Sequence, residues 1–183
     1  IAPFLTAGAF ALSALVFHTA APVTDVPAPK RVPFAVGEKA EYDVKFGAIK
    51  VGTSTMQVNG IETIRGREVW HTTFRLRGGT FFYKVDDMFE SWFDRETLAS
   101  LRFKQQLEEG SRERFKHYEM YPEKKTYMEM DKDPPREHAS VSDPLDDGSF
   151  LYFIRTLDLE VGKTYDFNRY FRPDRNPVRI RVL

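Results

Sequence analysis

The chain has 183 residues, 42% of them hydrophobic and 14% aromatic, which is enough apolar material for one domain with a true core. Its 27 basic and 27 acidic residues give a formal net charge of zero, so the chain as a whole lacks the positive charge typical of nucleic-acid-binding proteins. Cysteine is absent, which excludes disulfide bonds and thiolate metal sites.

Residues 1–21 are predicted to be a secretory signal peptide. Residues 4–17 form a continuous apolar, alanine-rich run that is shorter than the roughly 20 residues of a membrane span. Small residues follow at 19–21, where signal peptidase would cleave, and the basic segment that normally precedes such a run is missing. We therefore expect a periplasmic or otherwise exported bacterial protein. The alternative is an uncleaved N-terminal anchor.

The rest of the chain divides into a linker and one domain. Residues 22–33 are rich in proline and are predicted to form an extended linker. Residues 34–183 are predicted to form a single β-rich domain. We expect this domain to be truncated at its C-terminus, because the sequence stops at Leu183 within an apparent strand.

Alternating apolar and polar residues, separated by turn residues, predict a succession of β-strands along this domain. The expected strands are 40–46, 49–58, 68–77, 81–85, 87–94, 101–107, 112–121, 125–130, 138–141, 164–171 and 178–183. Asn59-Gly60 is predicted to be a turn, and Gly78-Gly79 to break a strand. This pattern indicates an all-β, mainly antiparallel sheet that is curled into a barrel or half-barrel.

One segment, residues 143–159, is predicted to be the principal α-helix. Asp143 is suited to cap the first turn and Pro144 to occupy the first helical position. Apolar residues then recur three and four positions apart, which is typical of a buried helical stripe. These residues are Leu145, Phe150, Leu151, Phe153, Ile154 and Leu157. We expect this helix to pack inside the curled sheet or across its mouth.

Three phrases of the sequence resemble a family of exported bacterial proteins. They are PFAVGEKAEYDV at 33–44, DMFESWFD at 87–94 and FLYFIRTLDL at 150–159. The family is known as domain of unknown function 3108 (DUF3108). The resemblance implies an exported or periplasmic β-rich domain and assigns no catalytic residue. A looser similarity, of fold alone, is to the half-barrel carriers of the lipoprotein-sorting type.

Aromatic residues are dense in the middle of the chain and on the predicted helix. We expect them to line a cavity between sheet and helix for a lipid or another hydrophobic or amphipathic ligand. The alternative is a closed aromatic core. The candidate ligand-binding residues are Phe81, Phe82, Tyr83, Trp92, Phe93, Phe103, Phe150 and Phe153.

Arginine is dense near the end of the chain, where Tyr170 and Phe171 lie among the arginines. A guanidinium group binds phosphate or carboxylate through two parallel hydrogen bonds, which favours an anionic envelope ligand here. The alternative is an ordinary strand with its arginines in solvent. The candidate anion-binding residues are Arg169, Arg172, Arg179 and Arg181, and Arg175 belongs to the same cluster.

The sequence contains no recognisable set of catalytic residues. The histidines at 71, 117 and 138 lack a short metal-binding spacing, and the acidic run at 86–94 lacks the loop of an EF-hand. No serine lies in a nucleophile-elbow motif. We therefore predict a non-enzymatic envelope protein without a metal or cofactor. Its expected partner is a lipid or other amphipathic ligand, the alternative is a structural or assembly factor that binds another envelope protein, and nucleic acid is not expected.

Overall fold

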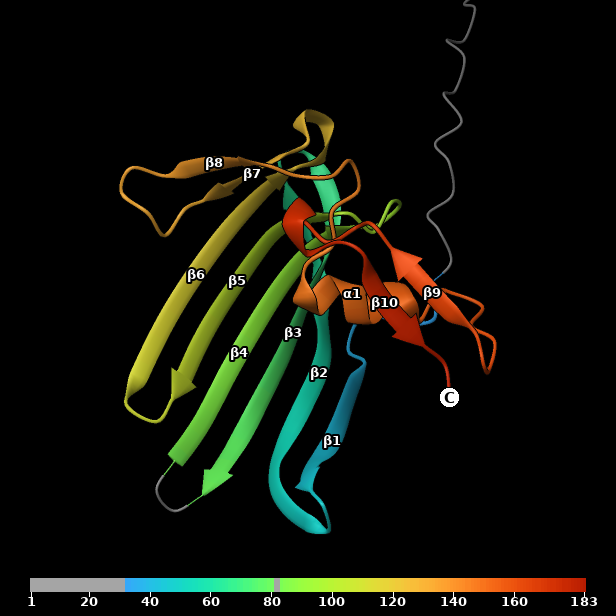
Figure 1. Ribbon diagram of the computed structural model, residues 1–183. Helices are drawn as coiled ribbons and strands as arrows, with labels where there is room; N and C mark the ends of the chain where they lie inside the picture. The colour runs from blue at the N-terminus through green and yellow to red at the C-terminus, as the bar shows by residue number, and fades with distance from the viewer. Residues whose placement is uncertain (1–31, 81–82) are drawn as a thin grey trace, which may run out of the picture.

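A computed structural model describes residues 32–80 and 83–183 (Figure 1). The predicted signal peptide lies outside the described residues, as do most of the linker and two candidate ligand-binding residues, Phe81 and Phe82. Each strand of the main sheet pairs antiparallel with the next strand along the chain. The strands are β1 Lys39–Phe46, β2 Ile49–Ile64, β3 Arg67–Thr80, β4 Tyr83–Asp94, β5 Ser100–Glu109, β6 Arg112–Tyr121, β7 Thr126–Glu129 and β8 Arg136–Ala139.

The sheet is curled but not closed, because β1 and β8 are its two ends. The remaining elements are the helix α1 Asp147–Ile154, the short 3-10 helices η1 Pro122–Lys124 and η2 Pro173–Arg175, and a separate hairpin of β9 Thr164–Phe167 and β10 Val178–Arg181. Figure 1 shows α1, β9 and β10 gathered near one end of the sheet, while the other ends of β1 to β6 extend away from them. The prediction of a mainly antiparallel half-barrel with one principal helix is confirmed.

The core lies between α1 and the face of the sheet that we call the inner face. Trp70 of β3 and Phe93 of β4 are opposite each other and are buried against Tyr152 and Phe153 of α1. A second inner cluster joins Phe103, Tyr118, Met120 and Tyr127 to Tyr170 and Phe171. A third cluster, which includes Val69 and Trp92, lies on the opposite, outer face, because successive side chains of a strand alternate between faces.

Strands β2, β3 and β4 are longer than the sequence indicated. The predicted turn at Asn59-Gly60 is wrong, since β2 continues through it with a shift of register after Val58. The predicted break at Gly78-Gly79 is also wrong. Gly78 lies opposite Gly52 of β2, and a Cβ atom on either glycine would collide with the backbone of the neighbouring strand. These two glycines therefore allow two long strands to approach closely.

The helix exists where it was predicted, but its boundaries are wrong. Its N-cap is Asp146, whose side chain accepts hydrogen bonds from the amides of Gly148 and Ser149 at 2.8 Å each. Leu145 precedes the helix and forms an isolated parallel bridge with Tyr170. The amide of Leu145 is thus committed to the backbone carbonyl of the residue before Tyr170, and the helix starts only after this bridge. It ends at Ile154 after eight residues.

Candidate ligand-binding site

The predicted ligand-binding aromatics do not line one common cavity. Phe93 and Phe153 are buried in the core between sheet and helix, and Phe150 is half-buried beside them. Phe103 belongs to the second cluster, where it stacks on Tyr118 with ring centres 6.2 Å apart. For these buried residues the closed-core alternative describes the structure.

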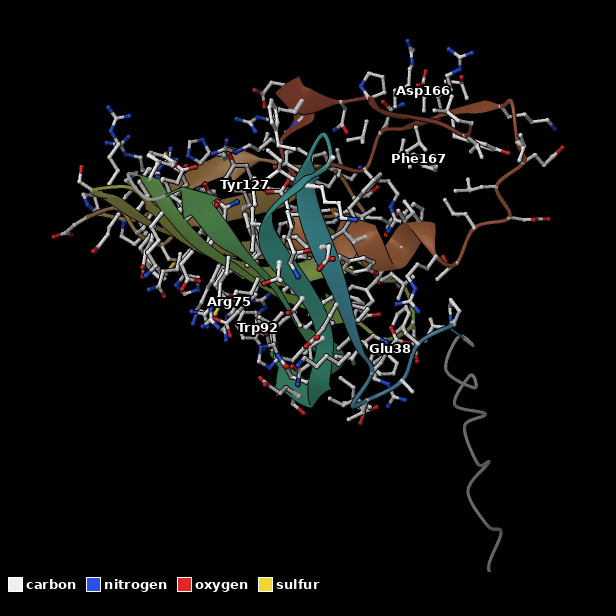
Figure 2. The ribbon with its side chains drawn as sticks, turned by 90° about the horizontal axis from the view of Figure 1, so that it is seen from below. Glu38, Arg75, Trp92, Tyr127, Asp166 and Phe167 are labelled. Atoms are coloured by element: carbon white, nitrogen blue, oxygen red, sulfur yellow. The ribbon has the colours of Figure 1, made fainter. Side chains whose placement is uncertain are left out.

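The other two described candidates lie elsewhere. Trp92 is buried on the outer face, where it stacks on His71 with ring centres 4.4 Å apart. Figure 2 shows Trp92 and Arg75 on the side of the sheet away from Phe167, which packs against α1. Tyr83 is 51% exposed at the start of β4. Trp92 therefore faces away from α1, whereas Tyr83 shares the inner face with Phe89 but lies at the opposite end of β4 from Phe93.

Beyond α1, the inner face carries two cross-strand rows of side chains, and each row ends in a basic residue on β6. The strand register aligns Met56, Phe74, Phe89, Gln105 and Lys116 in the first row, from β2 to β6. It aligns Ser54, Leu76, Asp87, Leu107 and Arg114 in the second. We call the half-buried apolar members the inner strip: Met56, Phe74, Leu76, Phe89 and Leu107.

Sequence reasoning missed the inner strip, although a signal for it was present. Phe74 and Leu76 alternate with polar residues in one predicted strand, and Phe89 lies in another. Only the strand register shows that they share a face. Asp87 lies within this apolar surface between Leu76 and Leu107, and burial there raises the pKa of its carboxyl group.

A pocket of about 190 Å³ lies at the basic end of the two rows, and we call it the β5–β6 pocket. It is bounded by the inner side of β5 and β6, the first residue of α1, and the segment around η2. Its lining residues are Phe103, Gln105, Leu107, Arg114, Lys116, Tyr118, Asp147, Tyr170, Phe171, Arg172 and Arg175. Leu107 belongs to both the inner strip and the pocket, so the apolar surface and the pocket are continuous.

Three of the four cations in this pocket have carboxylate partners. Lys116 lies 3.1 Å from Asp131, Arg114 lies 2.5 Å from Glu109, and Arg172 lies 3.5 Å from Glu129. The fourth cation, Arg175, forms no ion pair within the described part of the chain. Hydrogen bonding to Asp131, the largest effect, raises the pKa of Lys116 and keeps it charged.

One carboxylate, Asp147, faces these cations inside the pocket. It accepts hydrogen bonds from Gln105 Nε2 and from the Tyr170 hydroxyl, each at 3.1 Å. The surrounding pocket walls raise the pKa of Asp147 by partial desolvation, although its side chain keeps access to solvent. The pocket therefore offers both signs of charge together with four aromatic side chains.

The predicted arginine cluster is only partly brought together. Arg172 lines the β5–β6 pocket, as does its neighbour Arg175. Arg169 instead lies over the Phe153 ring at 4.6 Å and donates to the carbonyl of Asp143. Arg179 and Arg181 are exposed on β10, so for them the ordinary-strand alternative describes the structure. Sequence reasoning missed Arg114 and Lys116, which lie on the inner side of β6.

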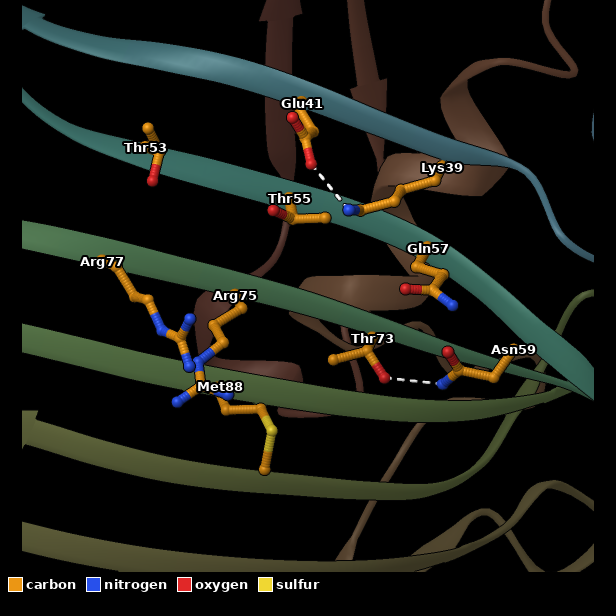
Figure 3. A pocket seen from close by; sticks show the side chains of 10 residues that line it. All are labelled: Lys39, Glu41, Thr53, Thr55, Gln57, Asn59, Thr73, Arg75, Arg77 and Met88. Atoms are coloured by element: carbon orange, nitrogen blue, oxygen red, sulfur yellow. Dashed lines mark hydrogen bonds and ion pairs between the residues drawn. The ribbon is translucent and has the colours of Figure 1, made fainter.

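A larger pocket of about 430 Å³ lies on the outer face across β1 to β4 (Figure 3). Its lining is mostly polar and comes from alternate residues of these strands: Lys39, Glu41, Thr53, Thr55, Gln57, Asn59, Thr73, Arg75, Arg77 and Met88. Several of these groups bind each other or a neighbour, as Lys39 does with Glu41 at 2.6 Å and Arg75 with Asp86 at 2.8 Å. The outer pocket therefore resembles a solvated, internally paired sheet face more than an apolar binding site.

A buried polar network connects the start of α1 to the sheet. Asp146 is fully buried, and its Oδ1 atom accepts a hydrogen bond from the Ser91 hydroxyl at 2.6 Å. Ser100 and Ser149 share a further hydrogen bond at 2.7 Å. Burial raises the pKa of Asp146 to about 6. These serines hold the helix in place and face neither of the two pockets.

Each described histidine that was considered as a site residue lies near a carboxylate. His71 lies between Glu62 and Glu90, and His138 lies 3.4 Å from Glu129. His117 binds Glu119 at 3.0 Å. None of the three lines either pocket. Among residues 32–80 and 83–183, no group of three His, Asp or Glu side chains is arranged to hold a metal ion.

Glu119 is a polar centre of the outer face that sequence reasoning missed. It is buried and accepts hydrogen bonds from Arg65 and Arg102 as well as from His117. Although burial opposes ionisation, these donors together keep the pKa of Glu119 below its usual value. The arrangement connects β5, β6 and the β2–β3 turn, and we interpret it as structural.

Comparisons with known proteins give a family but no described activity. A family model described as a protein of unknown function (DUF3108) matches residues 41–183. Searches among curated proteins and among solved structures give no match. No helix in the described part of the chain has the length and apolar character needed to cross a membrane.

Proposed function

Because the chain belongs to the DUF3108 family, whose description assigns no function, we propose a function from the geometry of its inner face. The protein is an exported, non-enzymatic binder of an amphipathic ligand. The apolar chain of the ligand lies on the inner strip, and its polar end reaches the β5–β6 pocket. The observation that supports this proposal is that the half-buried apolar side chains of the inner strip adjoin the β5–β6 pocket, with its cations, on one face of the sheet.

Surface energetics favour an apolar occupant of the inner strip. Neighbouring side chains such as Phe74 and Phe89, with ring centres 5.9 Å apart, leave part of their apolar surface in water. Contiguous apolar surface of this kind commonly marks an interaction site. A hydrocarbon chain that covers it gains roughly 25 cal/mol for each Å² of apolar area removed from water.

Two further observations support two parts of this proposal, namely that the protein is exported and that it is not an enzyme. The apolar run at 4–17 favours export through a signal peptide. The two pockets contain no histidine or serine side chain, and the serines near α1 are committed to the buried network around Asp146. Neither pocket therefore contains a Ser–His or Cys–His pair of nucleophile and base.

Titration with dodecanoate tests the proposal. Phe89→Asn removes an apolar member of the inner strip, whereas Met88→Asn changes the adjacent, half-buried residue on the outer face. We expect Phe89→Asn to bind dodecanoate at least tenfold more weakly than the wild type, and Met88→Asn to bind it equally well. Equal binding by all three proteins would contradict the proposal.

A second pair of variants keeps the proposal testable if a variant of the first pair misfolds. Leu107→Asn changes the inner strip, and Gln106→Asn changes its exposed neighbour. Circular dichroism melting of each variant establishes that it is folded before binding is compared. Native mass spectrometry of the mature protein, purified mildly from the bacterial envelope, then shows whether it carries a lipid-sized added mass.

The second candidate function, an assembly factor for another envelope protein, is favoured by one specific feature. Strand β1 is an end of the sheet, so the backbone groups along one of its edges have no strand partner. Tyr42, Phe46 and Ile49 are exposed on or beside it. A photo-crosslinking residue at position 46 tests this candidate. An assembly factor should give one specific protein adduct, and a Tyr42→Asp substitution in the same protein should remove that adduct.

A further inference from the structure

The β5–β6 pocket places a carboxylate among its cations, which would oppose the binding of a simple anion. Its four cations are Arg114, Lys116, Arg172 and Arg175. Asp147 faces them inside the pocket, and three of them also pair with carboxylates that do not line it. A free phosphate would be attracted by the cations and repelled by Asp147. A simple amine, in contrast, would be attracted by Asp147 and repelled by the cations.

We infer that this pocket binds a zwitterionic group in which an ammonium and a phosphoryl ester are joined by a short linker, as in the head group of an ethanolamine phospholipid. The inference deepens the proposed function and relies on it for the placement of the hydrocarbon chain. It assigns the ammonium group to the carboxylate of the pocket and the phosphoryl group to its cations.

The ammonium end suits the surroundings of Asp147. This carboxylate accepts hydrogen bonds from Gln105 and Tyr170, and two oxygens with about four lone-pair sites leave capacity for another donor. The rings of Phe103 and Phe171 line the same pocket but are buried, so the Asp147 carboxylate rather than a ring face would hold the ammonium.

The phosphoryl end suits the cations. Arg175 lines the pocket without an ion-pair partner among the described residues, so its five N–H donors are available for phosphate oxygens. Lys116 and Arg114 end the two rows of the inner face, next to Gln105 and Leu107 respectively. A phosphoryl ester held there has its ester oxygen directed toward the inner strip, where the rest of an amphipathic molecule lies.

The size of the pocket agrees with a head group alone. Its volume of about 190 Å³ is below the roughly 300–1,000 Å³ of pockets that enclose whole drug-sized ligands. Leu107, which is shared with the inner strip, marks the junction between head group and chain.

The test uses probes that have no hydrocarbon chain. The folded full chain is titrated with glycerophosphoethanolamine, glycerol 3-phosphate and ethanolamine, and binding is followed by NMR chemical-shift changes. We expect glycerophosphoethanolamine to bind at least tenfold more tightly than either other probe. Asp147→Asn should abolish this preference, Asp147→Glu should retain it, and Arg175→Ala should weaken both phosphate-containing probes.

Matched controls change exposed charges that do not line the pocket. Asp166→Asn on β9 and Arg181→Ala on β10 should leave all three affinities unchanged. Equal affinity for glycerol 3-phosphate and glycerophosphoethanolamine, with no effect of Asp147→Asn, would overturn the inference in favour of a simple anion site. Failure of the folded wild type to bind glycerophosphoethanolamine would also overturn it.

One more probe identifies the source of the group. Dihexanoyl phosphatidylethanolamine, used below its micelle concentration, should bind at least tenfold more tightly than glycerophosphoethanolamine if the natural ligand is a lipid. Equal binding would retain the zwitterion site and assign it to a free phosphorylated amine. Because the chain-free probes do not involve the inner strip, these results are separate from the dodecanoate titration that tests the proposed function.

Discussion

The Ser91 hydroxyl donates a hydrogen bond to Asp146 Oδ1 at 2.6 Å, and this bond joins strand β4 to the cap of helix α1. The same oxygen atom accepts hydrogen bonds from the backbone amides of Gly148 and Ser149. One buried carboxylate therefore both starts the helix and fixes its position on the sheet. The position of α1 on the sheet, and therefore the part of the inner face that it leaves uncovered, depends on this contact.

Gly148→Ala should weaken that contact. A Cβ atom at position 148 would collide with the Ser91 hydroxyl oxygen, which would have to turn away from Asp146. Leaving a buried polar group without its partner costs roughly 1–3 kcal/mol, and we expect the free energy of unfolding in urea to fall by that amount. Gly60→Ala is the control, because nothing lies within 4 Å of a Cβ atom there. Equal stability of Gly148→Ala and the wild type would show that the cap tolerates displacement.

The pH dependence of stability should reveal the burial of Asp146. Burial raises its pKa from 3.8 to about 6, so the folded state favours the neutral acid. The stability that the folded protein gains from holding this proton is fully present below pH 3.8, and it is lost as pH rises through 6. Asp146→Asn keeps an N-cap side chain but cannot ionise.

The wild type should therefore lose about 3 kcal/mol of unfolding free energy relative to Asp146→Asn between about pH 4 and pH 7, at roughly 1.4 kcal/mol per pKa unit. Urea titrations of both proteins at several pH values measure this difference. A difference that stays constant over this range would mean that Asp146 titrates normally in the folded state.

Phe153→Ala should be strongly destabilising. Phe153 is 7% exposed in the core between helix and sheet, and truncation would leave a cavity there. We expect a loss of roughly 3–5 kcal/mol in unfolding free energy by urea titration. Phe115→Ala is the matched control, since Phe115 is 55% exposed. A loss below about 1 kcal/mol for Phe153→Ala would mean that this region repacks easily.

Arg179→Ala combined with Arg181→Ala should leave folding intact. Arg179 pairs with Asp166 at 2.7 Å, but both side chains are exposed, and ion pairs on the surface contribute little to stability because solvent screens them. Arg65→Ala provides the contrast, because Arg65 binds the buried Glu119 and two backbone carbonyls. Thermal unfolding followed by circular dichroism should stay cooperative in the double variant. Loss of cooperativity there would make the β9–β10 hairpin essential to the domain.

The sequence was sufficient for the class of fold because period-two alternation is a local signal. The strands that it predicted at 68–77 and 87–94 pair with each other in the structure within β3 and β4. It also located the helix. It could not place the start of the helix, because Pro144 and Asp143 form a plausible cap until Leu145 is seen paired with Tyr170, a residue 25 positions further along the chain.

The candidate site was harder to predict because it depends on register across five strands. Aromatic density identified Phe93 and Phe153, which the fold uses for its core. The residues that remain on the open inner face, such as Phe74 and Leu107, are not distinguished from them by composition. Arg172 was identified within its arginine cluster, but its neighbours in space on β6 are separated from it by more than 50 residues.

The open edge of the sheet has a consequence for kinetics. A hydrocarbon chain on the inner strip would lie in a trough that is unclosed between β1 and β8, so it could leave sideways while the fold stays as it is. Its residence time would then be set by the rewetting of apolar surface rather than by the opening of a gate. Each added methylene, worth about 0.8 kcal/mol, would lengthen that residence roughly fourfold.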